Sequence, residues 1–238
     1  MDILPPPLQW MRLTGLTILG RSTTLFNTIA KYGSGQSTLV SPTSGLCIEA
    51  PPRSGNSFFV MGFGMANPDV RLAHHHHVPA QVHRAIQLKV PVIALLRNPL
   101  DSALAKAAPG DEPFLVGTTL RRWVSFWHGI RGEMDSIIVA RFEDVIADPS
   151  AVIHRINAKY STGFSTEFPS TSAVFAALEK HRISDQGAEA ARRPNPNIPN
   201  EEIKRREDVL RPVAEGHPLT ERALRTYGSI LARLPSGD

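Results

Sequence analysis

The sequence predicts an α/β domain of three layers, in which a central, mostly parallel sheet is flanked by helices. Residues 90–96 read VPVIALL and residues 137–140 read IIVA, two short apolar runs rich in β-branched side chains. Strands that are apolar on both faces are typical of parallel sheets covered by helices. Between the two runs, apolar residues recur at helical spacing, at Leu120, Trp123, Val124, Trp127 and Ile130. This alternation of strands and helices predicts the α/β class.

The composition fits one folded domain with an anionic partner. The chain has 238 residues, of which 42% are hydrophobic and 20% charged, and its formal net charge is +4. This is enough apolar material for one core. The positive charge favours phosphates, sulfates, acidic glycans or a lipid surface, without choosing among them. The single cysteine, Cys47, cannot form an intramolecular disulfide, so we expect a cytoplasmic protein and a buried thiol without a chemical role.

Residues 1–44 are expected to form an N-terminal helical segment and linker, followed by the globular domain at residues 45–238. The apolar stretch at residues 8–30 is interrupted by two arginines, which make it too polar to span a bilayer. A helix packed on the domain and an amphipathic helix on a membrane surface both stay open for this stretch. A peripheral membrane contact through the N-terminal segment is therefore an alternative to a purely cytoplasmic location.

A strand, a short loop and a helix follow. Residues 46–50 are mainly apolar and predict the strand, and a helix is expected to begin at Asn56. The intervening loop, Pro52-Arg53-Ser54-Gly55-Asn56-Ser57, has the features of an anion site, because Arg53 supplies charge, Gly55 permits close approach of the backbone, and the helix start offers donors. An ordinary helix start with an exposed arginine is the alternative. The GxxxxGK[ST] pattern of triphosphate-binding loops is absent.

The remaining elements continue the alternation. Residues 70–73 predict a short strand, and the strand at residues 90–96 is closed by Arg97-Asn98-Pro99. Asp148-Pro149 predicts a helix that runs through Ile156, because proline is favoured in the first helical turn. Further helices are expected at residues 172–181, 201–210 and 220–234, with a polar stretch at residues 183–200 between the first two.

Three strings, in this order, resemble those of the sulfotransferases that use 3′-phosphoadenosine 5′-phosphosulfate (PAPS) as sulfuryl donor. IEAPPRSGNSFF is similar to the family's 5′-phosphosulfate loop, LLRNPLDSALA to its 3′-phosphate segment, and VARFEDVIADPSAVI to its third recurring string. The strings cover residues 46–156 of the chain. The resemblance implies a P-loop-like sulfotransferase fold, a member of the bacterial type, and PAPS as co-substrate without a metal.

The resemblance also implies roles for single residues. Arg53 would hold the 5′-phosphosulfate and stabilise charge on the bridging oxygen, and Phe58 stands where the family often has a tryptophan that stacks on adenine. Arg97 would bind the 3′-phosphate. Further hydrogen-bond donors to the phosphosulfate would come from Ser54, Gly55, Asn56 and Ser57.

Two parts of the implied donor site depart from the family's pattern. The second 3′-phosphate ligand, commonly a serine eight residues after the arginine, is Ala105 here, and Ser102 is the candidate to replace it. The family's late loop, rich in Arg, Lys and Gly, has a counterpart only in Arg192-Arg193, for which two solvated loop charges are the alternative.

The run His74-His75-His76-His77-Val78-Pro79 allows a catalytic and a metal-binding interpretation. Transfer to a hydroxyl needs a base, and the run resembles the Lys-x-His-Leu-Pro string of cytosolic sulfotransferases, with His77 in the base position and His75 in place of the lysine. Adjacent residues of an extended chain point in opposite directions and no recognised ligand spacing lies nearby, which argues against a metal. His77 is therefore the expected base, with a neighbour in the run as the next choice.

The sequence thus predicts a PAPS-dependent sulfotransferase with Arg53 and His77 as catalytic residues and a hydroxyl or amine acceptor. A P-loop-like nucleotide kinase and a non-catalytic nucleotide- or sulfoglycan-binding protein are the alternatives. The acceptor is expected to be a small molecule, a glycan or a lipid, and not nucleic acid. Glu143 and Asp144 are expected to be structural, as anchors of a helix or partners of Arg141.

Overall fold

One parallel sheet forms the centre of the molecule. The computed structural model describes Gly15, residues 19–20, 22–30, 36–187, Glu189, Arg192 and residues 194–234. Within these residues the sheet consists of β1 (Leu46–Glu49), β2 (Leu72–His74), β3 (Val92–Leu96) and β4 (Ile138–Arg141). Their order is β2-β1-β3-β4, and all neighbouring strands run parallel.

Alternate residues of each strand enter two separate cores. On β1, Leu46 and Ile48 face one core and Cys47 faces the other, as expected when successive side chains point to opposite faces of a sheet. On β3, Ile93 and Leu95 join the first core, whereas Val92, Ala94 and Leu96 join the second. The sheet is therefore the middle of three layers, which confirms the predicted α/β class.

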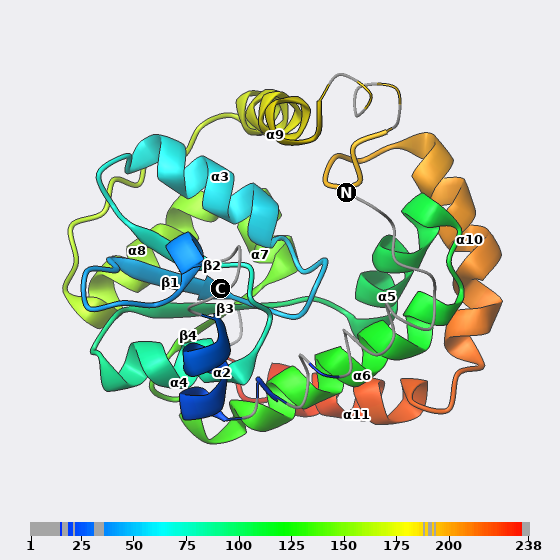
Figure 1. Cartoon of the computed structure of the whole chain (residues 1–238), viewed down its shortest axis with the longest axis horizontal. Coiled ribbons are helices and arrows are strands. Elements are labelled where there is room, and N and C mark those ends of the chain that lie inside the picture. The colour runs from blue at the N-terminus through cyan, green and yellow to red at the C-terminus, as the bar shows by residue number, and fades with distance from the viewer. Residues whose placement is uncertain are drawn as a thin grey trace.

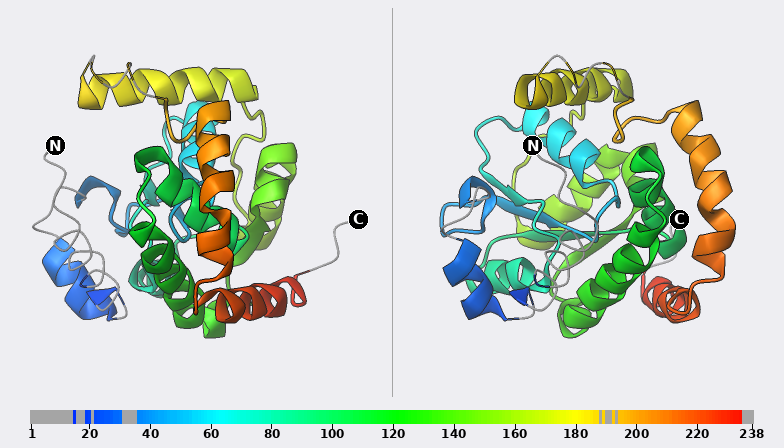
Figure 2. Two further views of the ribbon diagram at one scale, coloured as in Figure 1. Left: turned by 90° about the vertical axis from the view of Figure 1, so that its right-hand side faces the viewer. Right: turned by 45° about the vertical axis from the view of Figure 1, so that its right-hand side comes forward.

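Helices cover both faces of the sheet (Figure 1). The first core lies beneath α3 (Asn56–Ala66), α7 (Phe142–Ala147), α8 (Pro149–Tyr160) and α9 (Thr171–Gln186). The second core lies beneath α4 (Pro79–Gln87), α5 (Pro99–Ala107), α6 (Phe114–Gly129), α10 (Glu201–Glu215) and α11 (Thr220–Leu231). Figure 2 shows α10 running from the α9 side of the molecule to α11 at the opposite side. Short 3-10 turns occupy Gln36–Thr38, Ala108–Gly110 and Arg131–Glu133.

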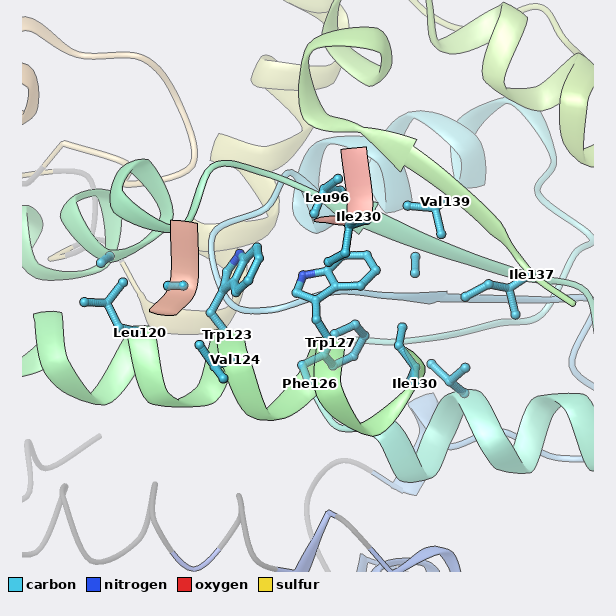
Figure 3. Close-up of a cluster of buried hydrophobic side chains, with 14 of the residues drawn as sticks. Leu96, Leu120, Trp123, Val124, Phe126, Trp127, Ile130, Ile137, Val139 and Ile230 are labelled. Carbon is cyan, nitrogen blue, oxygen red and sulfur yellow. The ribbon is translucent and has the colours of Figure 1, made fainter. Parts of the chain in front are cut away.

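Aromatic side chains of α6 dominate the second core (Figure 3). Trp123 and Trp127 are almost fully buried, with ring centroids 6.1 Å apart, and lie near Leu96, Val139 and Ile230 of the surrounding elements. Burial of large aromatic surfaces fixes α6 against the sheet. The indole N–H of Trp123 also donates to the carbonyl of Arg97 at 3.1 Å, so the core holds the residue that follows β3.

The N-terminal helix α2 (Thr23–Ala30) packs on α4. Its Phe26 forms a small buried cluster with Leu39, Val78 and Ala80. In the part of the chain that the structure describes, no helix combines the length and apolarity needed to cross a membrane. The proposed division of the chain at residues 44 and 45 stays a prediction.

The expected elements are present, with some differences in their bounds. The strand expected at residues 70–73 is β2, two residues further along, and the polar stretch predicted from residue 183 begins only after α9 has continued to Gln186. The sequence patterns also left out α4 and α5. Each begins with a proline in its first turn, a start signal that is clear once the preceding strand is located.

The strand order brings two of the predicted anion-binding segments together. The chain leaves β1 toward β2 on one side and then crosses to β3 on the other side, so the connections diverge at the carboxyl ends of β1 and β3. In open α/β sheets, ligands bind in the crevice at such a point. The loop after β1 carries Arg53, and β3 ends immediately before Arg97.

Candidate functional site

The loop of residues 52–57 turns through two left-handed backbone positions. Arg53 has φ 67° and Gly55 has φ 95°. A Cβ on Gly55 would approach the Phe142 ring to 3.0 Å, so glycine is needed for both conformation and space. A non-glycine residue such as Arg53 in this region stores strain, which is typical of functional sites.

Polar groups of this loop lie buried without protein partners. Among the described residues, the Ser54 hydroxyl and the Asn56 side-chain amide have no hydrogen bond, although Ser54 is 0% and Asn56 4% exposed. Buried polar groups are nearly always paired, so such exceptions need an explanation. Because they flank the N-terminus of α3, a bound anion with several oxygen atoms would satisfy them. The loop therefore fits the phosphosulfate group that the resemblance implies.

The guanidinium group of Arg53 is held by a distant segment, residues 194–200, which we call the strap. Its Nη1 donates to Asn197 Oδ1 at 2.7 Å, and its Nη2 donates to the carbonyl oxygen of Pro196. The strap is fixed in turn by Asn195, which donates to Glu179 Oε2 of α9 at 2.8 Å. Both acceptors of Arg53 are neutral, so an anionic ligand would be a stronger partner.

Arg97 lies directly beside the loop. Its Nη1 donates to the carbonyl oxygen of Arg53 at 2.8 Å, and its guanidinium group lies 4.3 Å from the centre of the Phe142 ring. Burial lowers the pKa of Arg97, and burial followed by the charge of Arg97 lowers the pKa of Arg53 to about 10. Both side chains remain cationic near neutral pH. The structure thus brings these two predicted residues together as a pair of positive charges.

Two other residues predicted for the donor site, Phe58 and Ser102, are buried. Phe58 is only 5% exposed, and its ring packs on Phe168 and Phe175 at centroid distances of 5.6 and 5.8 Å. The ring of Phe58 therefore belongs to the first core, and its stacking on adenine stays a prediction. The Ser102 hydroxyl is fully buried and, among the described residues, has no hydrogen-bond partner.

Of the basic pair Arg192-Arg193, the structure describes Arg192. Arg192 forms an ion pair with Glu189 at 2.8 Å, and its side chain is 77% exposed. Arg193 lies outside the described residues. A role for Arg192 and Arg193 in donor binding stays a prediction.

The run of four histidines begins at His74, the last residue of β2, and continues into a tight turn. His75 and His77 have φ values of 66° and 58°, so the run is not the extended chain that its sequence suggested. The turn places His74 Nδ1 2.5 Å from His75 Nδ1, and His75 Nε2 lies 3.2 Å from Ser57 Oγ. In the described part of the chain, no three His, Cys, Asp or Glu side chains are grouped to share a metal ion.

Glu49, which the sequence analysis did not single out, holds this turn. Its carboxyl group is 0% exposed and accepts the backbone N–H groups of His76 at 3.0 Å and His77 at 2.7 Å. Burial raises the pKa of Glu49 to about 8, while these N–H groups act in the opposite direction. The available signal was a single charged residue closing an otherwise apolar strand.

The position of His77 defines its tautomer. Its Nδ1 lies 2.7 Å from the carbonyl oxygen of Ala50, and because a carbonyl only accepts, Nδ1 carries the proton. The neutral ring then keeps a lone pair on Nε2. Burial, followed by the charge of Arg122, lowers the pKa of His77 well below its ordinary value, so the ring is neutral near pH 7.

A large cleft opens beside the loop and the histidine turn. Its volume is about 1420 Å³, and its lining includes Ser57, His74 and His75. Arg53, Arg97 and His77 are not part of this lining, whereas Pro196 and Asn197 of the strap are. The strap, which binds the guanidinium group of Arg53, therefore lies between Arg53 and the cleft.

One of the two carboxylates after β4 pairs with Arg141, which is one of the structural roles expected for them. Arg141 donates to both carboxylate oxygens of Asp144, with Nη2 to Oδ1 at 2.7 Å. Asp144 is thus the partner of Arg141, rather than Glu143. Cys47 is buried in the sheet, where burial raises the pKa of its thiol.

Comparisons with known proteins give a limited result. Neither the scan of protein families nor the search of curated proteins finds a match. Among solved structures, mouse sulfotransferase SULT7A1 in complex with PAP aligns with 85% of this chain and 89% of its own, at 12% sequence identity and a TM-score of 0.44.

Proposed function

We propose that the protein is a sulfotransferase that moves a sulfuryl group from PAPS to an acceptor hydroxyl or amine. The observation that carries this proposal is the meeting of the loop at residues 52–57 with Arg97 at the switch point of the sheet. Two cations and several buried donors without partners converge there. Such a set suits a ligand with two separate anionic groups, and the loop lacks the lysine of triphosphate-binding loops.

The donor would be held by the residues that the resemblance implies. Arg53, Ser54 and Asn56 would bind the phosphosulfate, and Arg97 would bind the 3′-phosphate. For Arg53 to do so, its contacts with Asn197 and Pro196 must be exchanged for contacts with the donor. The exchange replaces neutral acceptors with charged ones, which strengthens the hydrogen bonds.

The donor supplies an activated sulfuryl group, and the side chains supply charge and a base. Arg53 and the N-terminus of α3 would stabilise the negative charge that develops on the phosphate side as the bond to sulfur breaks. His77, with its free Nε2 lone pair, would accept the proton of the acceptor. No divalent cation is assigned to this chemistry.

His75 is a second candidate for the base, because it lines the cleft and lies within hydrogen-bond distance of Ser57. Burial lowers its pKa to about 4, so its ring is neutral near pH 7, as that of His77 is. Variants of the two residues separate these assignments.

A binding and turnover experiment tests the function. Dissociation constants for PAPS and ATP would be compared first, and transfer of radiolabelled sulfate to an acceptor mixture would follow. A sulfotransferase should prefer PAPS and release 3′-phosphoadenosine 5′-phosphate (PAP). Preference for ATP would support the kinase alternative, and PAPS binding without turnover would support a binding protein.

A further inference from the structure

The large cleft has two long walls made from single helix faces. The residues of α3 that line the cleft recur once per helical turn, at Ser57, at Val60 and Met61, and at Gly64 and Met65. From α9 the cleft receives residues with the same spacing, namely Leu178, His181, Arg182, Asp185 and Gln186. Residues at these intervals share one helix face. Figure 2 shows α9 lying across the α3 side of the molecule.

The α3 wall is aliphatic along most of its length. Val60, Met61 and Met65 follow one another away from Ser57, and Leu178 lies in the opposite wall. Met65 is 44% exposed and lies in the last turn of α3, so its side chain is accessible from the cleft. Methionine adapts to aliphatic ligands of varied shape. Among the described residues that line the cleft, none is a Phe, Tyr or Trp on which a sugar ring could stack.

The charged side chains of the cleft are already paired. Arg182 binds Glu179 at 2.6 Å, His181 lies 3.1 Å from Asp185, and Arg206 pairs with Glu202. Arg192 is held by Glu189. No lysine stands among the lining residues that the structure describes. Recognition of a polyanionic acceptor, such as a sulfated glycan, would need cations that are not neutralised in this way.

Two polar groups of the cleft lie where α3 begins. Ser57 and His75 lie there, 3.2 Å apart, next to the loop that carries Arg53. From this end, the aliphatic wall of α3 extends toward Met65. A ligand with one hydroxyl and a long apolar body would place its hydroxyl at the histidines and bury the body along α3. The volume of about 1420 Å³ exceeds the usual ~300–1,000 Å³ of small-molecule pockets.

We propose that the acceptor is a neutral, long-chain aliphatic alcohol bound in this cleft. The assignment rests on the proposed sulfotransferase function. In the reaction, the alcohol oxygen forms a bond to sulfur, the bond between sulfur and the donor's phosphate oxygen breaks, and the hydroxyl proton passes to the histidine base. The products are an alkyl sulfate and PAP.

The first test measures transfer from PAPS to 1-hexanol, 1-dodecanol, an uncharged oligosaccharide and a sulfated oligosaccharide. kcat/KM should rise with chain length, by up to about fourfold for each buried CH₂. Either sugar as the best acceptor would overturn the proposal, and so would the absence of transfer to both alcohols when PAP binds. Failure of PAP itself to bind would instead overturn the underlying function, so the two failures are distinguishable.

The second test uses Met65→Glu, with Val209→Glu as matched control. Val209 is 76% exposed on α10 and does not line the cleft. Met65→Glu should weaken 1-dodecanol binding, measured calorimetrically in the presence of PAP, by about tenfold, and leave PAP affinity unchanged. The control should change neither value. Equal 1-dodecanol affinity in Met65→Glu and wild type would contradict a body bound along α3.

Discussion

At the scale of single residues, Arg53 combines a strained backbone conformation with a positive charge in the loop after β1. It occupies a left-handed backbone conformation, and its guanidinium group binds only neutral protein oxygens. Arg53→Ala should lower the rate of sulfuryl transfer by about 10²- to 10³-fold, because the charge meets one that grows in the transition state. The exposed Arg121→Ala on α6 is the matched control and should retain the wild-type rate. An Arg53→Ala rate near that of wild type would exclude the proposed role.

His77→Ala should separate chemistry from binding. Loss of the base should lower the chemical step by roughly 10²- to 10⁴-fold, while PAP affinity stays nearly constant. Since the pKa of His77 lies well below its ordinary value of 6.5, the wild-type rate should stay level through pH 6.5 and decline only at more acidic pH. Full activity in His77→Ala together with loss in His75→Ala would move the base to His75.

Glu49 predicts an effect of pH on stability. Its pKa is raised from 4.5 to about 8 in the folded protein, so between these values the folded state holds a proton that the unfolded state releases. The stabilisation from this proton is present below pH 4.5 and is lost as the pH rises through about 8. The side chain of Glu49→Gln cannot titrate. The free energy of unfolding of wild type should therefore fall relative to that of Glu49→Gln as the pH rises from 4.5 to 8. Denaturant titrations of both proteins across this range measure the difference.

A constant difference between Glu49→Gln and wild type would contradict the raised pKa. An opposite slope would mean that the two backbone N–H groups keep the carboxyl ionised. In either case, Glu49→Gln should support more transfer than Glu49→Ala, because glutamine can still accept one N–H group of the turn. This comparison separates positioning of the histidines from general stability.

At the scale of elements, the strap occupies the guanidinium group of Arg53 with two hydrogen bonds. Asn197→Ala removes one acceptor of Arg53, at 2.7 Å, and should make this guanidinium group more available to an anion. A net hydrogen bond contributes about 0.5–1.5 kcal/mol, so PAP should bind about 2- to 10-fold more tightly. Isothermal titration calorimetry measures this change. Weaker binding would show that Asn197 belongs to the donor site itself.

Local patterns were sufficient to predict some elements and not others. The apolar run of β3 and the proline of α8 carry their own signals, so both were located from sequence. The histidine turn could not be predicted, because its positive φ values depend on Glu49, which lies on another strand. The burial of Phe58 could not be predicted for a similar reason: the rings that pack on it, Phe168 and Phe175, lie more than a hundred residues away in the chain.

At the scale of the whole molecule, strand order makes the proposed donor site. The loop after β1 and the residue after β3 are about forty residues apart in the chain. They meet because β1 and β3 are parallel neighbours, with β2 on one side of the pair and β4 on the other. The core beneath α6 then fixes Arg97 through the indole of Trp123. The sequence alone predicted the parallel sheet and the choice of Arg53 and Arg97 as anion-binding residues. It did not predict the strap between Arg53 and the cleft.

The most direct test of the central claim is the affinity for PAP compared with that for AMP, which lacks the 3′-phosphate, in wild type and Arg97→Ala. A hydrogen bond to a charged group contributes about 1.5–3 kcal/mol, so wild type should prefer PAP by about 10- to 150-fold. Arg97→Ala should remove most of this preference and leave AMP binding nearly unchanged. Equal affinity of wild type for PAP and AMP, or a preference that survives in Arg97→Ala, would contradict a donor site built from this loop and Arg97.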